Sequence, residues 1–146
     1  MEWKPKVVVA AVDGSEASLD AARLAAAIAR RNDARLVLVT SVRLPEGWWG
    51  MTGEPPSPHA LSEALMAGQQ RVMDSTIGEI DLAGINHGAV VQLGDPTAEI
   101  IALCEKENAD LLVIGRRGAG LVERMVIGSV ADRLAHHAPC PLLIVP

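Results

Sequence analysis

The stretch KVVVAAVDGS, residues 6–15, decides the fold class of this chain. Its apolar residues follow one another without polar alternation, which is typical of a parallel strand buried on both faces. Asp13-Gly14-Ser15 closes the run with a turn signal. From Glu16 to Arg31 apolar residues recur at helical spacing, and Ser15 is suited to cap that helix. The start of the chain therefore predicts a strand that passes directly into a helix.

The remainder of the chain repeats this alternation. Asp95 fits the N-cap of one later helix, and Pro96 fits its first position. The alternation predicts an α/β fold, with residues 1–146 as a single domain built on an open, parallel, five-stranded sheet with helices on both faces. Further strands are expected at Arg35–Val42, His87–Leu93, Asp110–Ile114 and Pro141–Val145, and further helices at Pro58–Leu82, Pro96–Glu107 and Ser129–His137.

The segment Arg43–His59 departs from this pattern. It holds four Pro, three Gly and the pair Trp48-Trp49, and it has no periodicity. Because it is longer than most connections between elements, we interpret it as a functional lid or an insert. The two Trp side chains then cover a bound base, take part in an interface or anchor the loop.

The composition excludes several classes of protein. The chain carries 13 Lys and Arg against 18 Asp and Glu, a formal net charge of −5, which argues against sequence-independent binding to nucleic acid or an anionic membrane. With no Phe and no Tyr, it lacks an aromatic platform for stacking bases. No apolar run approaches the roughly 20 residues of a membrane span. Two Cys do not make a disulfide scaffold, and the helical spacing of Cys104 places it in the core, so we expect a cytoplasmic protein.

Two predicted strands end in residues suited to chemistry. Ligands of parallel sheets lie outside the carboxyl ends of the strands, where the strand order reverses. One such end is Asp13-Gly14-Ser15, and the other is the run GRRGAG, residues 115–120. The two ends meet if the first and fourth strands are neighbours.

The loop from Gly115 to Ser129 suits a phosphate group. Its glycines allow close backbone approach, and Gly128-Ser129 precedes a helix whose N–H groups and dipole favour an anion. Three Arg against one Glu give the loop a charge of +2. The loop matches neither a Walker A motif nor GxGxxG. By residue chemistry alone, an ordinary turn with Ser129 as a helix cap explains the same residues equally well.

The spacing Gly115-x2-Gly118-x9-Gly128-Ser129 matches the signature G-x2-G-x9-G-(S/T) of the universal stress protein family. The chain also resembles that family at Val12–Ser15, at Gly94-Asp95-Pro96 and in its ending Ala138–Pro146. The resemblance spans essentially the whole chain. It implies the ATP-binding branch of the family, the strand order 3-2-1-4-5 and a homodimer formed through the last strand.

The resemblance also implies an ATP site, position by position. Asp13 would contact the adenosine half, or alternatively a magnesium ion carried by ATP, and the backbone of Ser41 would border the adenine. The remaining positions fall into three groups: Ala11 and Val12 on the same wall as the adenine; Gly115, Arg116 and Gly118 facing ribose and phosphates; and Gly128, Ser129 and Val130 holding the phosphate tail.

The resulting hypothesis is a regulatory, ATP-binding stress-response protein that acts as a homodimer, in which the nucleotide changes contacts with an unknown protein partner. One alternative is an enzyme that hydrolyses ATP slowly or transfers a nucleotidyl group. The sequence offers no P-loop lysine and no base paired with a nucleophile for that chemistry. Another alternative is a nucleotide-free interaction module, against which the intact glycine motif counts.

Overall fold

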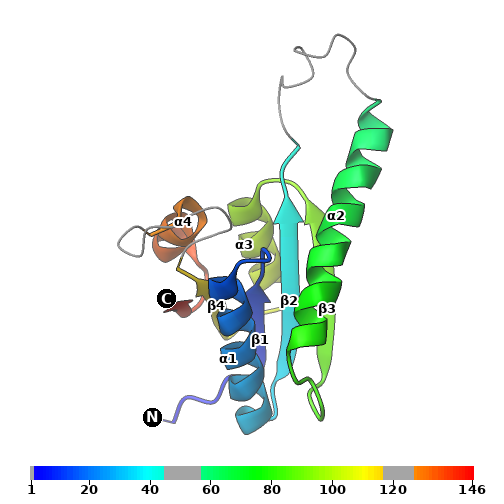
Figure 1. The fold of residues 1–146 in the computed structure, drawn as a ribbon. Coiled ribbons are helices and arrows are strands. Elements are labelled where there is room, and N and C mark those ends of the chain that lie inside the picture. Colours follow the sequence, from blue (N-terminus) through cyan, green and yellow to red (C-terminus); the bar gives the residue numbers. More distant parts are fainter. Residues whose placement is uncertain (1, 45–56, 117–126) are drawn as a thin grey trace.

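A computed structural model describes residues 2–44, 57–116 and 127–146 of the chain. Strands and helices alternate as predicted (Figure 1). The elements are β1 (Val7–Ala11), α1 (Glu16–Asn32), β2 (Arg35–Val42), α2 (Pro58–Glu79), β3 (His87–Leu93), α3 (Pro96–Lys106), β4 (Leu111–Gly115), α4 (Ser129–His137) and β5 (Leu142–Val145).

The predicted boundaries of the later strands and helices lie within about one residue of the observed ones, except at the end of α2. Helix α2 ends at Glu79 and not at Leu82, and its C-cap Ile80 is already extended. The guanidinium of Arg30, on α1, donates to the backbone carbonyls of Asp81 at 2.8 Å and Ala83 at 3.3 Å. These contacts hold the extended chain after α2 against α1.

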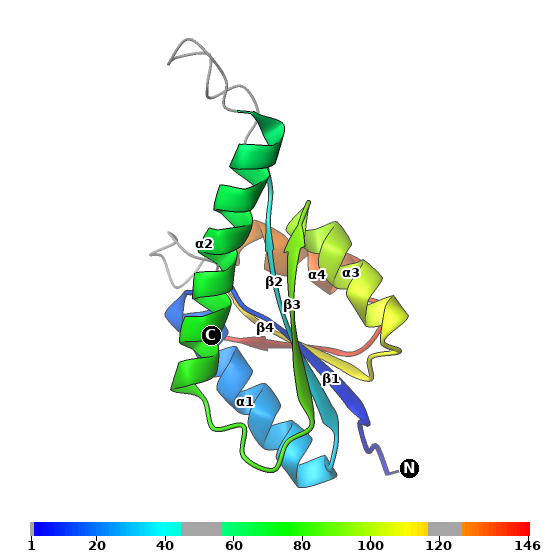
Figure 2. The same ribbon diagram turned by 90° about the vertical axis from the view of Figure 1, so that its right-hand side faces the viewer.

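The sheet is parallel and has the strand order β3-β2-β1-β4-β5, which confirms the fold class and the order implied by the family resemblance. Helices α1 and α2 cover one face, and α3 and α4 cover the other (Figure 2). Successive strand residues point to opposite faces. Val8 therefore packs towards α1, and Val9 packs towards α3 and α4, which explains why the strand sequences are apolar throughout.

Alanines form the face of α1 that lies on the sheet. Small side chains let a helix backbone lie close to the layer beneath it. The buried alanines of this helix are Ala21, Ala22, Ala25, Ala26 and Ala29. The tight contact matters below, because the first turn of α1 also borders the candidate site.

The predicted helix caps are present. The Ser15 hydroxyl accepts from the Ser18 N–H at 3.2 Å, and the Asp95 carboxylate accepts from the Ala98 N–H at 3.0 Å. Pro96 occupies the first turn of α3, where its missing N–H leaves no bond unmade. None of the helices in the described part of the chain has the length and apolar character that a membrane-spanning segment requires.

Cys104 lies in the core between α3 and the sheet, as predicted, with 2% of its surface exposed. Burial raises the pKa of the Cys104 thiol to about 12, and the neighbouring Cys140 thiol, a hydrogen-bond partner, adds to the rise. Cys140 is half-buried, and burial raises its pKa as well. Because the thiolate is the reactive form, neither thiol is activated.

We therefore expect Cys104 in the folded protein to resist alkylation by iodoacetamide when the reaction is run at a pH about one unit below the ordinary thiol pKa. Mass spectrometry of native and urea-unfolded samples measures this, since the unfolded chain should be labelled at Cys104 promptly. Labelling of Cys104 in the native protein at the rate of a free thiol would contradict its burial.

Candidate functional site

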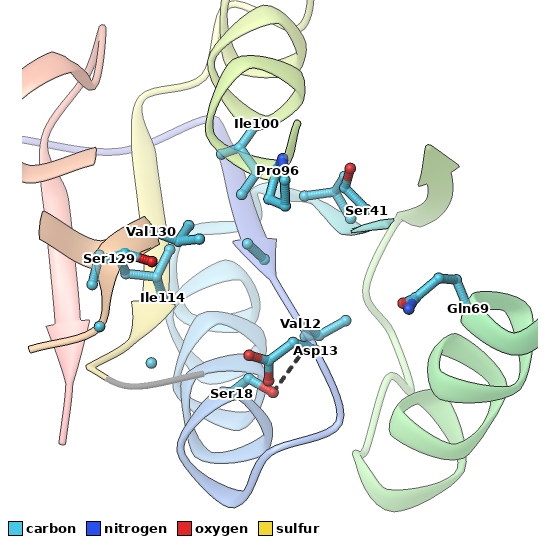
Figure 3. A pocket seen from close by; sticks show the side chains of 15 residues that line it. Val12, Asp13, Ser18, Ser41, Gln69, Pro96, Ile100, Ile114, Ser129 and Val130 are labelled. Atoms are coloured by element: carbon cyan, nitrogen blue, oxygen red, sulfur yellow. Dashed lines mark hydrogen bonds between the residues drawn. The ribbon is translucent and has the colours of Figure 1, made fainter. Parts of the chain in front are cut away.

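The candidate site is a cavity of about 490 Å³ at the carboxyl ends of the parallel strands (Figure 3). Its size is typical of small-molecule sites. Since β1 and β4 are neighbours, the two strand ends with suitable residues meet at this edge, as their sequences require for a shared site. Of the predicted site residues, the lining contains Ala11, Val12, Asp13, Ser41, Gly115, Gly128, Ser129 and Val130.

Two predicted site residues are not in this set. Arg116 is half-buried beside the lining residue Gly115 but does not itself line the cavity. Gly118 lies outside the described residues, as do Trp48 and Trp49. Their predicted roles stay predictions.

Asp13 is oriented by the turn that leads from β1 into α1. Its Oδ1 accepts from the Ser15 N–H at 2.9 Å and from the Ser15 hydroxyl at 2.6 Å. Its own backbone N–H donates to the Ser18 hydroxyl at 3.2 Å, the bond drawn in Figure 3. Gly14 adopts a φ of +87° in the turn, a conformation that glycine reaches without strain. The turn thus holds an exposed carboxylate at the cavity.

Packing requires a glycine at position 115, in addition to the predicted role of Gly115 in facing the ribose and phosphates. A Cβ atom at this position would lie 2.9 Å from both the Ala17 carbonyl carbon and the Ser18 nitrogen. The end of β4 therefore touches the backbone of the first turn of α1, and a side chain does not fit between them. The glycine that the motif assigns to phosphate approach is also required for packing.

The N-terminus of α4 opens onto the cavity. Gly128 is its N-cap, so the alternative that Ser129 serves as a helix cap is wrong: Ser129 is the first helical residue. The Gly128 N–H donates to the Arg116 carbonyl at 2.9 Å, and the Arg116 N–H donates to the Val145 carbonyl at 2.7 Å. Both ends of the glycine-rich loop are thereby fixed at the carboxyl ends of β4 and β5.

Capping distinguishes α4 from the other helices. Side chains of Ser15, Ser57 and Asp95 accept from the first turns of α1, α2 and α3. Within the described residues, α4 has no side-chain cap. The first N–H groups of a helix have no acceptor inside the helix. The residues that carry these groups in α4, Ser129, Val130 and Ala131, line the cavity, and such a helix start suits an anion.

Sequence reasoning missed several lining residues. Apolar side chains from β2, α3, β4 and α4 line the cavity, and Ser18 and Gln69 add polar groups from α1 and α2. The position of Pro96 just after a strand end could have indicated that it lines the cavity. Nothing in the helical pattern of α2 indicates that Gln69 does. The missed residues are Ser18, Val39, Gln69, Pro96, Ile100, Ile114 and Ala131.

Charged side chains gather beside the cavity at the start of α3. Asp95, next to the lining residue Pro96, forms ion pairs with Arg43 and with Arg133, the latter at 3.9 Å. Two arginines against one carboxylate leave this group positive. Within the described residues, no group of three His, Cys, Asp or Glu side chains is arranged to hold a metal ion.

The sequence profile of the universal stress protein family matches residues 5–146. The chain belongs to the universal stress protein family. It is thus a stress-response protein, 33% identical to a universal stress protein of Methanocaldococcus jannaschii, with 96% of this chain and 81% of the relative covered. A universal stress protein of Thermus aquaticus is 32% identical, over 96% of this chain and 98% of its own.

Solved structures of universal stress proteins share the fold. UspA from Lactobacillus plantarum superimposes with a TM-score of 0.80 at 23% identity, covering 99% of this chain and 100% of its own. A universal stress protein in complex with cAMP superimposes with a TM-score of 0.65 at 24% identity, covering 99% and 98%. At these identities the likeness shows the α/β fold alone.

The packing at Gly115 generates a prediction about stability. Gly115→Ala should lower the free energy of unfolding by about 1–3 kcal/mol, the usual cost of forcing atoms into a filled space. Gly78→Ala is the matched control: a Cβ there meets nothing within 4 Å, so this helical substitution should stabilise the protein by about 0.5–1 kcal/mol. Urea denaturation measures both changes. Equal stability of the two variants would show that Gly115 is not required for packing.

Proposed function

We propose that this universal stress protein binds ATP in the cavity and acts as a regulatory protein, with residues 1–146 as its single domain. The observation that carries the proposal is the uncapped N-terminus of α4, which opens onto a cavity that also holds an apolar wall and an oriented carboxylate. Each of these three features suits one part of a nucleotide.

The phosphate tail fits the α4 end of the cavity. Backbone N–H groups of Ser129, Val130 and Ala131 lie there together with the Ser129 hydroxyl. An anion gains from these donors and from the positive end of the helix dipole. The fixed loop ends, Arg116 and Gly128, keep this helix start in place before a ligand arrives.

The nucleoside fits the other half. Val39, Pro96 and Ile100 give the wall an apolar surface suited to a flat base. Asp13 can accept hydrogen bonds from the ribose hydroxyls, because the Ser15 N–H and hydroxyl orient its carboxylate through Oδ1. The neighbour in complex with cAMP carries an adenine nucleotide, which is the ligand class proposed here.

Magnesium would enter with the nucleotide. Among the described lining residues, Asp13 is the carboxylate, and its Oδ1 already accepts two hydrogen bonds. A single carboxylate fits an ion that is held mainly by phosphate oxygens. Asp13 would then orient such an ion without binding it alone.

Isothermal titration calorimetry with ATP and adenosine tests the proposal. Asp13→Ala should weaken both ligands by the same factor, about tenfold, because its partner is the nucleoside. Ser129→Ala should cost about 1 kcal/mol of binding free energy for ATP and nothing for adenosine. Asp20→Ala and Ser62→Ala, both outside the lining, are the matched controls and should bind as the unmodified protein does.

Two results would contradict this assignment. Absence of ATP binding to the unmodified protein would overturn the proposed function. If Asp13→Ala weakened ATP and left adenosine unchanged, Asp13 would act through the phosphate-bound magnesium and not through the nucleoside.

We also propose that the protein is a homodimer joined through β5. This strand pairs with β4 on one side, and in the described part of the chain its other side is the edge of the sheet. Its four residues are apolar and only half-buried, and Pro141 and Pro146 flank them. An apolar edge with unpaired N–H and C=O groups favours pairing with a second chain, and two-fold pairing closes the assembly.

Light scattering should give the unmodified protein twice the mass of one chain. Leu143 packs towards α1 and Ile144 towards the opposite layer, so Leu143→Asp and Ile144→Asp test both faces of the strand. At least one variant should be folded by circular dichroism and monomeric. Ala89→Asp, exposed on the opposite edge strand β3, should remain dimeric. Two folded variants that both stay dimeric at micromolar concentration would place the interface elsewhere.

A further inference from the structure

Gln69 brings an amide into the cavity from a helix that the glycine motif does not involve. It lies in α2, on the side of the sheet that α1 also covers, and it is half-buried. Figure 3 shows its side chain reaching from α2 towards the cavity, on the side of Ser41 and opposite Ser129 and Val130. The amide therefore stands at the end of the cavity away from the proposed phosphate site.

A buried threonine holds this amide in one orientation. The Thr40 hydroxyl donates to Gln69 Oε1 at 2.8 Å. Thr40 is 2% exposed and lies in β2 between the lining residues Val39 and Ser41. A hydroxyl buried this deeply needs a hydrogen-bond partner, and in the described part of the chain Oε1 is the acceptor that it has.

The amide nitrogen of Gln69 is consequently directed away from Thr40. Within residues 2–44, 57–116 and 127–146, Nε2 has no hydrogen-bond partner, although Gln69 is half-buried and lines the cavity. An amide NH2 carries two donors. In a site of low dielectric constant a donor gains more from an acceptor than it does in water.

We propose that Gln69 recognises the base of the nucleotide by donating an Nε2 hydrogen bond to an unprotonated ring nitrogen, with Thr40 as the residue that positions the amide. This inference rests on the proposed function, because it names the group that reads the base in the same cavity. Adenine offers three ring acceptors outside its glycosidic nitrogen, namely N1, N3 and N7. Ser41 and Pro96 lie at the same end of the cavity and confine the base next to the amide.

The test compares Gln69→Glu with Gln70→Glu by titration calorimetry. Glutamate at position 69 has the same shape and still accepts from Thr40, but it presents a carboxylate oxygen where Nε2 stood. The affinity of Gln69→Glu for adenosine should fall about tenfold or more, and its affinity for ATP should fall at least as far, because the new charge also repels the phosphates. Gln70 is exposed and donates to Asp74 at 2.9 Å, so Gln70→Glu makes the same charge change one residue away and should bind as the unmodified protein does.

Deaza analogues then identify the acceptor. Of 1-deaza-, 3-deaza- and 7-deazaadenosine, the one that lacks the contacted nitrogen should bind the unmodified protein more weakly than adenosine does. The same analogue should bind Gln69→Met no more weakly than adenosine, because that variant has no donor to lose. Thr40→Val should weaken adenosine binding by releasing the amide, and Thr40→Ser should restore it. Circular dichroism melting of each variant separates these losses from unfolding.

The outcomes separate this inference from the proposed function. If the unmodified protein binds neither ATP nor adenosine, the proposed function fails. If it binds both and folded Gln69→Glu and Gln69→Met bind them equally well, Gln69 does not read the base and the nucleotide site stands. If each deaza analogue loses the same affinity relative to adenosine in Gln69→Met as it does in the unmodified protein, the inference is overturned in the same way.

Discussion

The close contact between the first turn of α1 and the end of β4 is the constraint on which the site depends. A helix faced with alanines lies near enough to the sheet for Gly115 to touch the backbone of Ala17 and Ser18. That contact brings the turn holding Asp13 next to the strand that leads to α4. With a larger residue at position 115 or larger side chains on α1, the carboxylate and the α4 N-terminus would move apart. Packing and the proposed ligand site therefore share the same residues here.

The second constraint is whether a side chain caps the N-terminus of each helix. Three helices use a side chain to satisfy their first N–H groups, and the described part of α4 does not. A helix start without a cap leaves donors that water or a ligand must satisfy. Because α4 is fixed through Arg116 and Gly128 at the end of β4, these donors are held at the cavity before binding. Such preorganisation lowers the cost of ordering a charged ligand.

The sequence predicted the fold well, because continuous apolar strands and capped helices are local signals. The runs around Val9 and Val37 are buried on both sides as their composition requires, and Asp95 caps α3 as its position before Pro96 indicated. Strand order came from the family resemblance and not from the strands, since no local pattern says which strands are neighbours. The role of Ser129 was harder to predict, because whether Gly128 or Ser129 is the cap depends on the backbone angles at the helix start.

Gln69 shows why part of the site could not be predicted. Its contact with Thr40 joins residues 29 positions apart, and it exists because α2 packs against β2. The helical pattern of α2 is weak, so the sequence does not fix which of its residues faces the strands. Gly115 is a related case: the motif marked it, but its packing role appears only when α1 is in place.

A crystal structure of the protein with ATP tests the central claim most directly, because it locates both ends of the ligand at once. The account predicts the adenine beside Ser41 and Gln69, the ribose near Asp13, and phosphate oxygens within hydrogen-bond distance of the Ser129, Val130 and Ala131 N–H groups. ATP bound on another surface, or bound in this cavity with its base against α4, would contradict it.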